Sequence, residues 1–326
     1  MNKLASGADT LRYVRFAGRP AATAPRHAER SNAPLPQALP VAANSSEPPG
    51  AFASWVFERA GLAVEGYRGE PLRRRLSACL RALHAHTEAQ ARRILEERPE
   101  LLPVAVSALL IGTTEFFRDA PVYETLRTEA LPKLARRSRP LRVWSAACSS
   151  GAELYSLAIL LAEAGLLEGS FLLGSDCRHD AIEEAAAALY NSHDLGKVAA
   201  PVRRKYFEAA GGAWRPVEPL RRRAHWKVAD LGRRIEQGPW DVILWRNMGI
   251  YLKADAAAAV WQGLISVLAP GGVLVAGRAE RPPAELPLTY VGRCIYRACP
   301  CHGGRTSGPR SRPANRRSLM VLEDSK

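Results

Sequence analysis

One stretch of the sequence decides how the rest of the chain is organised. Residues 141–156 read LRVWSAACSSGAELYS. The apolar beginning is typical of a strand, and the small residues from Ala146 to Gly151 are typical of a tight turn. The residues that follow are typical of a helix. A strand, a turn of small side chains and a helix build the ligand crevice of an open α/β sheet. Because the turn lacks the glycines of a dinucleotide fingerprint, an ordinary strand–helix turn is an equal alternative for this stretch alone.

Strands and helices alternate from this stretch to about residue 298, which predicts a doubly wound, mostly parallel α/β sheet. Apolar runs predict strands at 141–146, 171–175, 241–246 and 272–277. Helical patterns predict helices at 152–165, 179–190 and 254–268. An antiparallel hairpin is expected to close the sheet with segments 286–291 and 293–298. Residues 191–230 break the alternation and predict a small inserted subdomain, with a short strand near 226–228.

The segment before the sheet is predicted to be helical. Phe52, Val56 and Phe57 recur at helical spacing, and leucines between 72 and 83 do so again. We expect an all-helical N-terminal domain over 51–118 and then the sheet domain over 119–298, which starts with a helix up to about residue 136. The first 50 residues are rich in Ala and Pro, with seven prolines, and predict a disordered arm. The basic segment 299–326 predicts a disordered tail.

Composition narrows the class of protein. The chain has 326 residues, 47% of them hydrophobic, and a formal charge of +14. No apolar run is long enough to span a membrane, and the N-terminus has no apolar signal core, so a cytoplasmic protein is expected. Six cysteines in a chain of this size favour a reduced state over a disulfide scaffold. The charge favours acidic partners, which leaves nucleic acid, anionic lipid and a Glu-rich protein surface open.

Acidic residues follow two of the expected strands. Asp176 ends the second strand, where a carboxylate can accept both hydroxyls of a ribose. A helix N-cap is the alternative for Asp176. Asp230-Leu231 follows the short strand near 226–228 and could hold a base ring at the same edge, although alone it is an ordinary loop aspartate.

Two further segments carry polar residues suited to a site. Arg246, Asn247 and Tyr251 follow an apolar strand, and three such residues together favour function over a structural role. Thr114 and Arg118 lie one helical turn apart, so they could face one site, where an Arg can hold a carboxylate bidentately. A salt bridge at the domain junction is an equal alternative for this pair.

Taken in order, these stretches resemble the CheR-type chemotaxis receptor methyltransferases, which are protein-glutamate O-methyltransferases. The resemblance covers about residues 51–298. Its motifs are Thr114–Asp119, Val143–Gly151, Tyr155–Ser156, Ser175–Asp176, Arg246–Asn247 with Ile250–Tyr251, and Pro270–Gly272 with Glu280. It implies a helical N-terminal domain, a Rossmann-like S-adenosylmethionine methyltransferase domain and an inserted β-subdomain.

The resemblance also implies an activity and a site. The activity is methyl transfer from S-adenosyl-L-methionine to glutamates of chemoreceptor cytoplasmic helices, giving methyl esters in chemotaxis-type signalling. The implied cofactor contacts are Thr114, Arg118, Ala147, Glu153, Asp176, Asp230, Leu231 and Asn247. The residues implied beside the entering glutamate are Arg118, Arg246 and Tyr251. No metal is expected, because a sulfonium and a carboxylate need only positioning and exclusion of water.

Partners follow from the same resemblance. Arg73, Arg74 and Arg75 resemble the family's receptor-facing surface, with a solvated basic face as the equal alternative. A monomer without membrane insertion is expected. A nucleic-acid methyltransferase or binder ranks last, because basic stretches interleaved with aromatics are absent from the sequence. Cys299 to His302 offers two thiols and one imidazole, one ligand short of a tetrahedral site.

Several motif positions depart from the family pattern. Gly112 stands in place of Asn, and Arg178 in place of a second acid after Asp176. Ala152, Leu154 and Ala279 replace a Glu, a Pro and a Ser. Each lost charged hydrogen bond could cost about 1.5–3 kcal/mol. The departures therefore keep open an alternative, a catalytically impaired protein that serves as a binding or scaffold module in a chemosensory pathway. A contact between Arg178 and Asp176 would fill the ribose site with protein and favour that alternative.

Overall fold

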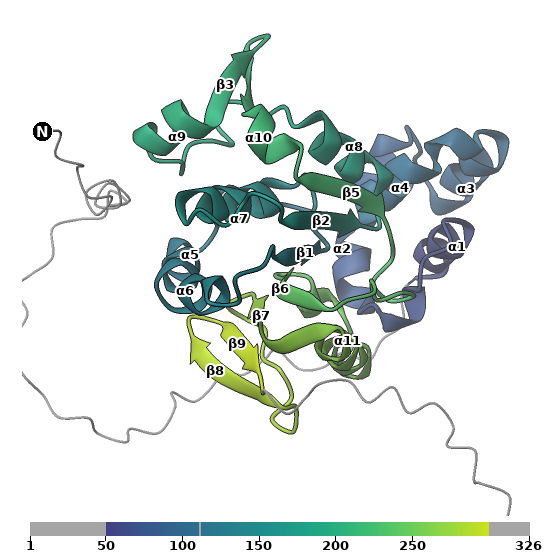
Figure 1. Cartoon of the computed structure of the whole chain (residues 1–326). Helices are drawn as coiled ribbons and strands as arrows, with labels where there is room; N and C mark the ends of the chain where they lie inside the picture. The colour runs from purple at the N-terminus through teal and green to yellow at the C-terminus, as the bar shows by residue number, and fades with distance from the viewer. Residues whose placement is uncertain (1–49, 111, 300–326) are drawn as a thin grey trace, which may run out of the picture.

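A seven-stranded sheet forms the centre of the computed structural model, which describes residues 50–110 and 112–299. Its strands are β1 (Arg142–Ala146), β2 (Phe171–Asp176), β5 (Ala224–Val228), β6 (Trp240–Trp245), β7 (Leu268–Ala276), β8 (Leu288–Gly292) and β9 (Ile295–Ala298). The strand order is β5-β2-β1-β6-β7-β9-β8 (Figure 1). The first five strands are parallel, and β9 runs antiparallel to both β7 and β8. The predicted mostly parallel sheet with a closing hairpin is confirmed.

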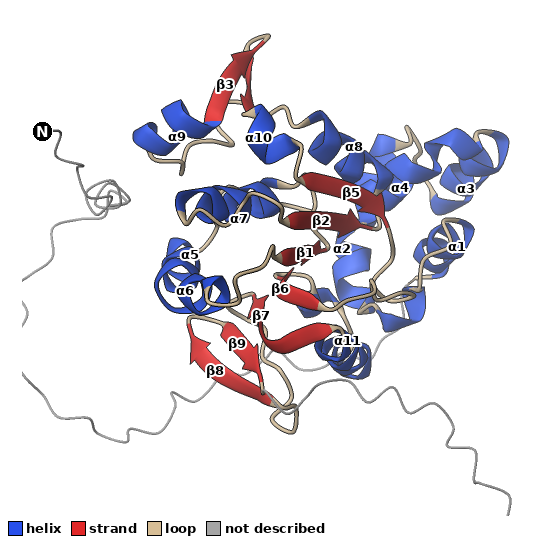
Figure 2. Ribbon diagram, viewed as in Figure 1, coloured by secondary structure: helices blue, strands red, loops and turns tan. Residues whose placement is uncertain are grey.

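Helices cover both faces of the sheet, as Figure 2 shows. The helices packed with one face are α1 (Ala51–Arg59), α2 (Gly69–Ala82), α3 (Glu88–Glu97), α4 (Leu102–Leu109) and α11 (Ala254–Ser266). Those packed with the other are α5 (Ala120–Thr125), α6 (Leu131–Ala135), α7 (Ala152–Glu163), α9 (Ala200–Tyr206) and α10 (Glu218–Arg221). The remaining helix, α8 (His179–Ala187), packs against β2 and β5. Short 3-10 turns lie at Val64–Gly66, Pro99–Leu101 and Gly249–Tyr251.

The two faces follow from the alternation of side chains along each strand. Trp144 on β1 belongs to the core on the α11 side, whereas its neighbour Val143 belongs to the core on the α7 side. On β6, Ile243 and Val242 divide in the same way. Successive side chains of a strand point to opposite faces, so a strand covered on both sides is apolar throughout. This accounts for the continuous apolar runs in the sequence.

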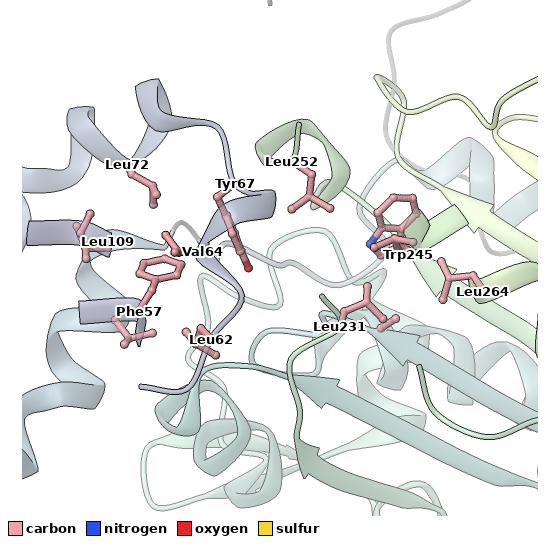
Figure 3. Packing of buried hydrophobic residues seen from close by; sticks show 14 of the residues in the cluster. Phe57, Leu62, Val64, Tyr67, Leu72, Leu109, Leu231, Trp245, Leu252 and Leu264 are labelled. Atoms are coloured by element: carbon pink, nitrogen blue, oxygen red, sulfur yellow. The ribbon is translucent and has the colours of Figure 1, made fainter. Parts of the chain in front are cut away.

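The N-terminal helices share a hydrophobic core with the sheet. Phe57 and Leu72 lie in the same buried cluster as Trp245 and Leu264, and Figure 3 shows the labelled side chains running from one group to the other. Backbone hydrogen bonds join the same parts, because the amide of Lys253 donates to the carbonyl of Gly66 at 2.8 Å. The helical segment is therefore fixed against the carboxyl edge of the sheet, where it can form one wall of a site.

The insertion is smaller than the sequence predicted. Strands β3 (Phe207–Ala210) and β4 (Ala213–Pro216) form an antiparallel hairpin that projects from the molecule (Figure 1). The strand after them was predicted to belong to the insertion, and this is wrong. It is β5, which pairs in parallel with β2 at the edge of the main sheet. Its residues are exposed or half-buried, so it lacks the apolar run that marks the inner strands.

The predicted helix from about residue 119 to 136 is present but irregular. A π-helical turn at Leu126–Ala130 separates α5 from α6. Pro132 follows this turn, and a proline inside a helix lacks the N–H of one helical hydrogen bond and crowds the preceding turn. The wider turn accommodates it.

Two predictions fall outside the described residues: the arm, of which only residue 50 is described, and the tail beyond residue 299. Within the described part of the chain, every helix is too short or too polar to cross a membrane.

Candidate active site

A pocket lies where the strand order reverses. From β1 the chain adds β2 and then β5 on one side, and afterwards it returns to add β6 and β7 on the other side of β1. Such a switch point at the carboxyl edge is where open α/β sheets bind ligands. The pocket wall includes residues that follow β1, β2 and β6, together with residues of the N-terminal helices. The sheet thus supplies one side of the site and the helical segment the other.

Most of the predicted site residues line this one pocket. They are Thr114, Arg118, Ala147, Glu153, Asp176, Arg246, Asn247 and Tyr251. Among the described residues, the wall includes neither Asp230 nor Leu231. The Asp230 carboxylate instead accepts hydrogen bonds from the backbone amides of Ala63 and Gly232, both at 2.8 Å. Asp230 therefore ties the helical segment to the sheet edge.

The turn after β1 has an unusual backbone. Ala147 and Ser149 have φ angles of +62° and +52°, a left-handed conformation that residues with a Cβ rarely adopt. Such backbone strain persists only where surrounding contacts fix it, and it is concentrated at functional sites. Here the amide of Cys148 donates to the carbonyl of Ser175 at 2.9 Å, and the amide of Ser149 to Asp176 Oδ2 at 2.8 Å. These two hydrogen bonds fix the turn after β1 against the carboxyl end of β2.

Asp176 is buried and already has partners within the protein. Its Oδ1 accepts hydrogen bonds from the backbone N of Arg178 at 3.0 Å and from Arg178 Nε at 3.3 Å. Arg178 Nη2 also donates to Ser149 Oγ at 3.0 Å. The contact between Arg178 and Asp176 that the sequence raised as a possibility is present. The guanidinium lies beside the carboxylate that the sequence analysis assigned to a ribose.

A second buried charge network surrounds Glu153. Its Oε1 accepts a hydrogen bond from Ser145 Oγ at 3.0 Å, and its Oε2 accepts one from Arg246 Nη1 at 3.1 Å. Arg246 Nη2 donates to Asp119 Oδ2 at 2.8 Å and to the carbonyl of Arg118 at 2.9 Å. Burial by itself lowers the pKa of Arg246, but Glu153 and other neighbouring groups raise it, with a net rise. Arg246 therefore stays charged and is engaged by protein acceptors.

The loop after β6 is held by Glu280. This buried carboxylate accepts hydrogen bonds from the amides of Asn247 at 2.8 Å, Gly249 at 2.7 Å and Gly277 at 2.6 Å. Burial raises the pKa of Glu280, and these backbone donors oppose the rise. The loop places Asn247 in the pocket wall with φ at +60° and with its side-chain Oδ1 buried and unpartnered within the protein. A buried acceptor without a partner fits a ligand that brings a donor.

Sequence reasoning missed the wall that the N-terminal helices provide. Its members are Tyr67, Arg68, Pro71, Leu72, Leu109 and Leu110. Burial raises the pKa of Tyr67, and Cys177 and Asp230 raise it further, so its phenol stays neutral. Local patterns contain no signal for this wall, because it arises when a helical segment docks on a distant sheet edge.

A comparison with known protein families shows the family of this chain. A family model described as "CheR methyltransferase, SAM binding domain" matches residues 112–289, more than half of the chain. The chain belongs to the CheR methyltransferase family. The family match spans the turn after β1, the end of β2 and the loop after β6, so it contains the sheet side of the pocket. Membership makes the protein a methyltransferase whose cofactor is S-adenosylmethionine, as the resemblance predicted.

Curated chemotaxis protein methyltransferases are similar over more than half of the chain. The chemotaxis protein methyltransferase of Vibrio anguillarum is 33% identical over 189 residues, which cover 56% of this chain and 69% of that protein. Chemotaxis protein methyltransferase 2 of Pseudomonas aeruginosa is 30% identical over 261 residues, which cover 74% and 89%. A solved magnesium protoporphyrin IX methyltransferase from Synechocystis with bound SAH is 18% identical, covers 51% of this chain and 61% of that one, and gives a TM-score of 0.29.

The residues present fit the cofactor of the CheR family. Buried carboxylates at Asp176 and Glu153 suit the hydroxyls and the ammonium group of such a molecule, and Asn247 Oδ1 offers an unused acceptor. The misfit is Arg178, whose guanidinium shares the Asp176 carboxylate.

Proposed function

We propose that this protein methylates glutamate side chains of chemoreceptor-like proteins and so produces methyl esters in a chemosensory pathway. The observation that carries the proposal is the gathering of Glu153, Asp176 and Asn247 on one pocket wall in a chain of the CheR family. The names of its relatives, chemotaxis protein methyltransferases, support the pathway.

The cofactor contacts divide along the pocket. Asp176 is assigned to the ribose hydroxyls, Glu153 and the backbone at Ala147 to the methionine end, and Asn247 to a further donor of the cofactor. Thr114 lies in the same wall. The adenine is assigned to the wall at Cys177 and Tyr67 in place of Asp230 and Leu231, because the first two residues line the pocket and the last two do not.

The chemistry asks little of the protein beyond positioning. When bound, S-adenosylmethionine supplies a methyl group on a sulfonium that is already activated toward a carboxylate nucleophile. Arg118 and Tyr251 line the pocket and are assigned to the entering glutamate. Arg118 Nη1 donates to the carbonyl of Thr113 at 2.9 Å, which orients its guanidinium. Arg246, which was predicted to lie beside the glutamate, is assigned to hold Glu153 in place, because its two terminal nitrogens donate to Glu153, Asp119 and a backbone carbonyl, while its Nε is buried without a protein partner.

Charge supports an acidic substrate. Helix α2 exposes Arg73, Arg74 and Arg81, and its first turn contains Pro71 and Leu72 of the pocket wall. A Glu-rich receptor helix that lies along α2 would bring a carboxylate to the pocket mouth, and complementary charge would speed its association. We propose that the protein acts on such helices as a cytoplasmic monomer.

The test is in two steps. Calorimetric titration with S-adenosylhomocysteine measures the cofactor site, with Asp176→Ala as the variant and Asp255→Ala, an exposed residue on α11, as the matched control. We expect Asp176→Ala to weaken binding at least about tenfold and the control to leave it unchanged.

Methyl transfer is then measured with labelled S-adenosylmethionine and a receptor cytoplasmic fragment. A fragment with Gln at its methylation sites is the control substrate. Base-labile label on the Glu fragment only is the expected result. Cofactor binding without label on any receptor fragment would contradict the proposed substrate.

A further inference from the structure

Two departures from the family pattern meet in space. Gly112 and Arg178 are far apart in the sequence, yet a Cβ added to Gly112 would collide with the guanidinium of Arg178. Ser149 completes the group, because its Oγ accepts from Arg178 Nη2 and donates to the carbonyl of Gly112, both at 3.0 Å. We call Gly112, Ser149, Asp176 and Arg178 the Arg178 latch.

The latch competes for hydrogen-bonding capacity at Asp176. A carboxylate offers about four acceptor positions. Three are used, by the amides of Ser149 and Arg178 and by Arg178 Nε. Two ribose hydroxyls need two positions, so a bidentate ribose contact requires Arg178 Nε to leave. The longest of the three bonds, at 3.3 Å, is the one that has to break.

The latch is built into the pocket. Asp176 and Arg178 are buried, with exposed fractions of 6% and 9%, and both line the cavity. Gly112 leaves room for the Arg178 guanidinium, since any other side chain at that position would occupy the same space. The position of the guanidinium therefore depends on both residues. Without the arginine the space beside Gly112 would be empty, and with a larger residue at position 112 the arginine could not enter it.

We infer that Arg178 is an intramolecular competitor of the cofactor, which binds only when the guanidinium has left Asp176. This inference rests on the proposed role of Asp176 at the ribose. It deepens that role, because Arg178, which is not one of the predicted cofactor contacts, would control the affinity for the cofactor. A binding-competent state that is only partly populated lowers the apparent affinity by its population.

The experiment removes the competitor in two independent ways. Arg178→Ala deletes the guanidinium, and Gly112→Ala displaces it while the charge stays in the chain. Calorimetric titration with S-adenosylhomocysteine is carried out on the full chain, on both variants and on the double variant. Arg93→Ala, an exposed arginine on α3, is the matched control. Thermal denaturation without ligand shows which variants are folded.

We expect each single variant to bind S-adenosylhomocysteine about ten- to hundredfold more tightly than the unmodified chain. The double variant should gain no more than the better single variant, because both changes open the same latch. A merely structural role would not produce this gain, since loss of a structural contact weakens binding.

The opposite results are distinct. If the unmodified chain binds and both variants bind equally or more weakly, the latch is refuted, while the cofactor assignment stands. If the unmodified chain and every folded variant fail to bind at millimolar ligand, the cofactor assignment falls together with the latch. That outcome would favour the binding-module alternative. If only the unmodified chain fails and the variants bind, the latch is closed in the resting protein and the inference is supported.

Discussion

Replacing Arg246 by methionine tests the assignment of this residue to structure. Its side chain is 2% exposed and pairs with Glu153 at 3.1 Å and with Asp119 at 2.8 Å. Methionine keeps much of the volume but removes every donor. Two carboxylates then lose a buried partner, and removal of one partner of a buried ion pair costs about 3–5 kcal/mol.

Urea denaturation followed by tryptophan fluorescence measures this loss. With a denaturant dependence of about 2 kcal/mol per molar, the midpoint should fall by about 1.5–2.5 M. The matched control is Arg278→Met, because Arg278 pairs with the same Asp119 at 3.9 Å but is 81% exposed. An exposed pair contributes less than about 1 kcal/mol, so this variant should unfold close to the unmodified chain.

Two results would refute the reasoning. One is an Arg246→Met chain within about 1 kcal/mol of the unmodified one, since a group that served only the substrate would be dispensable for folding. The other is an Arg246→Lys chain that keeps full stability and loses only affinity for the receptor fragment. A lysine ammonium cannot serve three acceptors with the fork of a guanidinium, so the structure predicts that this variant loses stability as well.

Three further changes have defined outcomes. Asp241→Ala removes a fully buried carboxylate that pairs with two arginines, and the urea midpoint should report a loss of about 3–5 kcal/mol; an unchanged midpoint would contradict this. Gly174→Ala sets a Cβ against the Trp226 ring, so thermal denaturation should show a loss of about 1–3 kcal/mol rather than the gain usual for Gly→Ala. Burial by itself raises the pKa of Glu163, but hydrogen bonds from Lys205 and a tyrosine lower it below its ordinary value. The resulting stability is present above the ordinary pKa and is lost as pH falls through the lowered one. Glu163→Gln should therefore be less stable than the unmodified chain at pH 7, and the difference should shrink as pH falls below the ordinary pKa and vanish once pH is below the lowered one; a constant difference would argue against the ion pair.

The inner strands were predictable because their burial is symmetric. Val143 and Trp144 are both fully buried, one on each face of β1, so the strand appears in the sequence as an apolar run. Helix ends were less certain. The helix predicted to reach residue 165 ends at Glu163, and Gly165 lies just beyond it with φ at +68°, a common position for glycine after a helix.

The edge of the sheet was harder to predict than its centre. β5 lacks an apolar run and is separated from the β3–β4 hairpin only by the short helix α10, so local patterns assigned it to the insertion. Asp230 illustrates the limit for single residues. Asp230 was correctly predicted to lie at the carboxyl edge of the sheet, because it follows a parallel strand. The direction of its side chain depends on the amide of Ala63, which arrives from the helical segment.

The candidate site was predicted residue by residue but not as a network. The sequence marked Gly112 and Arg178 as separate losses, and it gave no sign that one makes room for the other. It likewise placed Arg246 at the site without the two carboxylates that engage it. Pairings between distant segments depend on how the chain folds. No local pattern in a single sequence indicates them.

The core shared by the N-terminal helices and the sheet has a consequence for how the protein opens. Val56 and Phe57 of α1 and Trp261 of α11 lie in one continuous buried cluster. Loss of either side would expose the other to water, so the slowest-exchanging amides of the α4 helix and of β6 should become deuterated in a single global event. A chain trimmed to start where the family match begins, at residue 112, would keep α11 but lose the N-terminal helices, so part of the apolar core on this side of the sheet would be exposed. For this protein, the folding unit and the pocket both begin N-terminal to the family match.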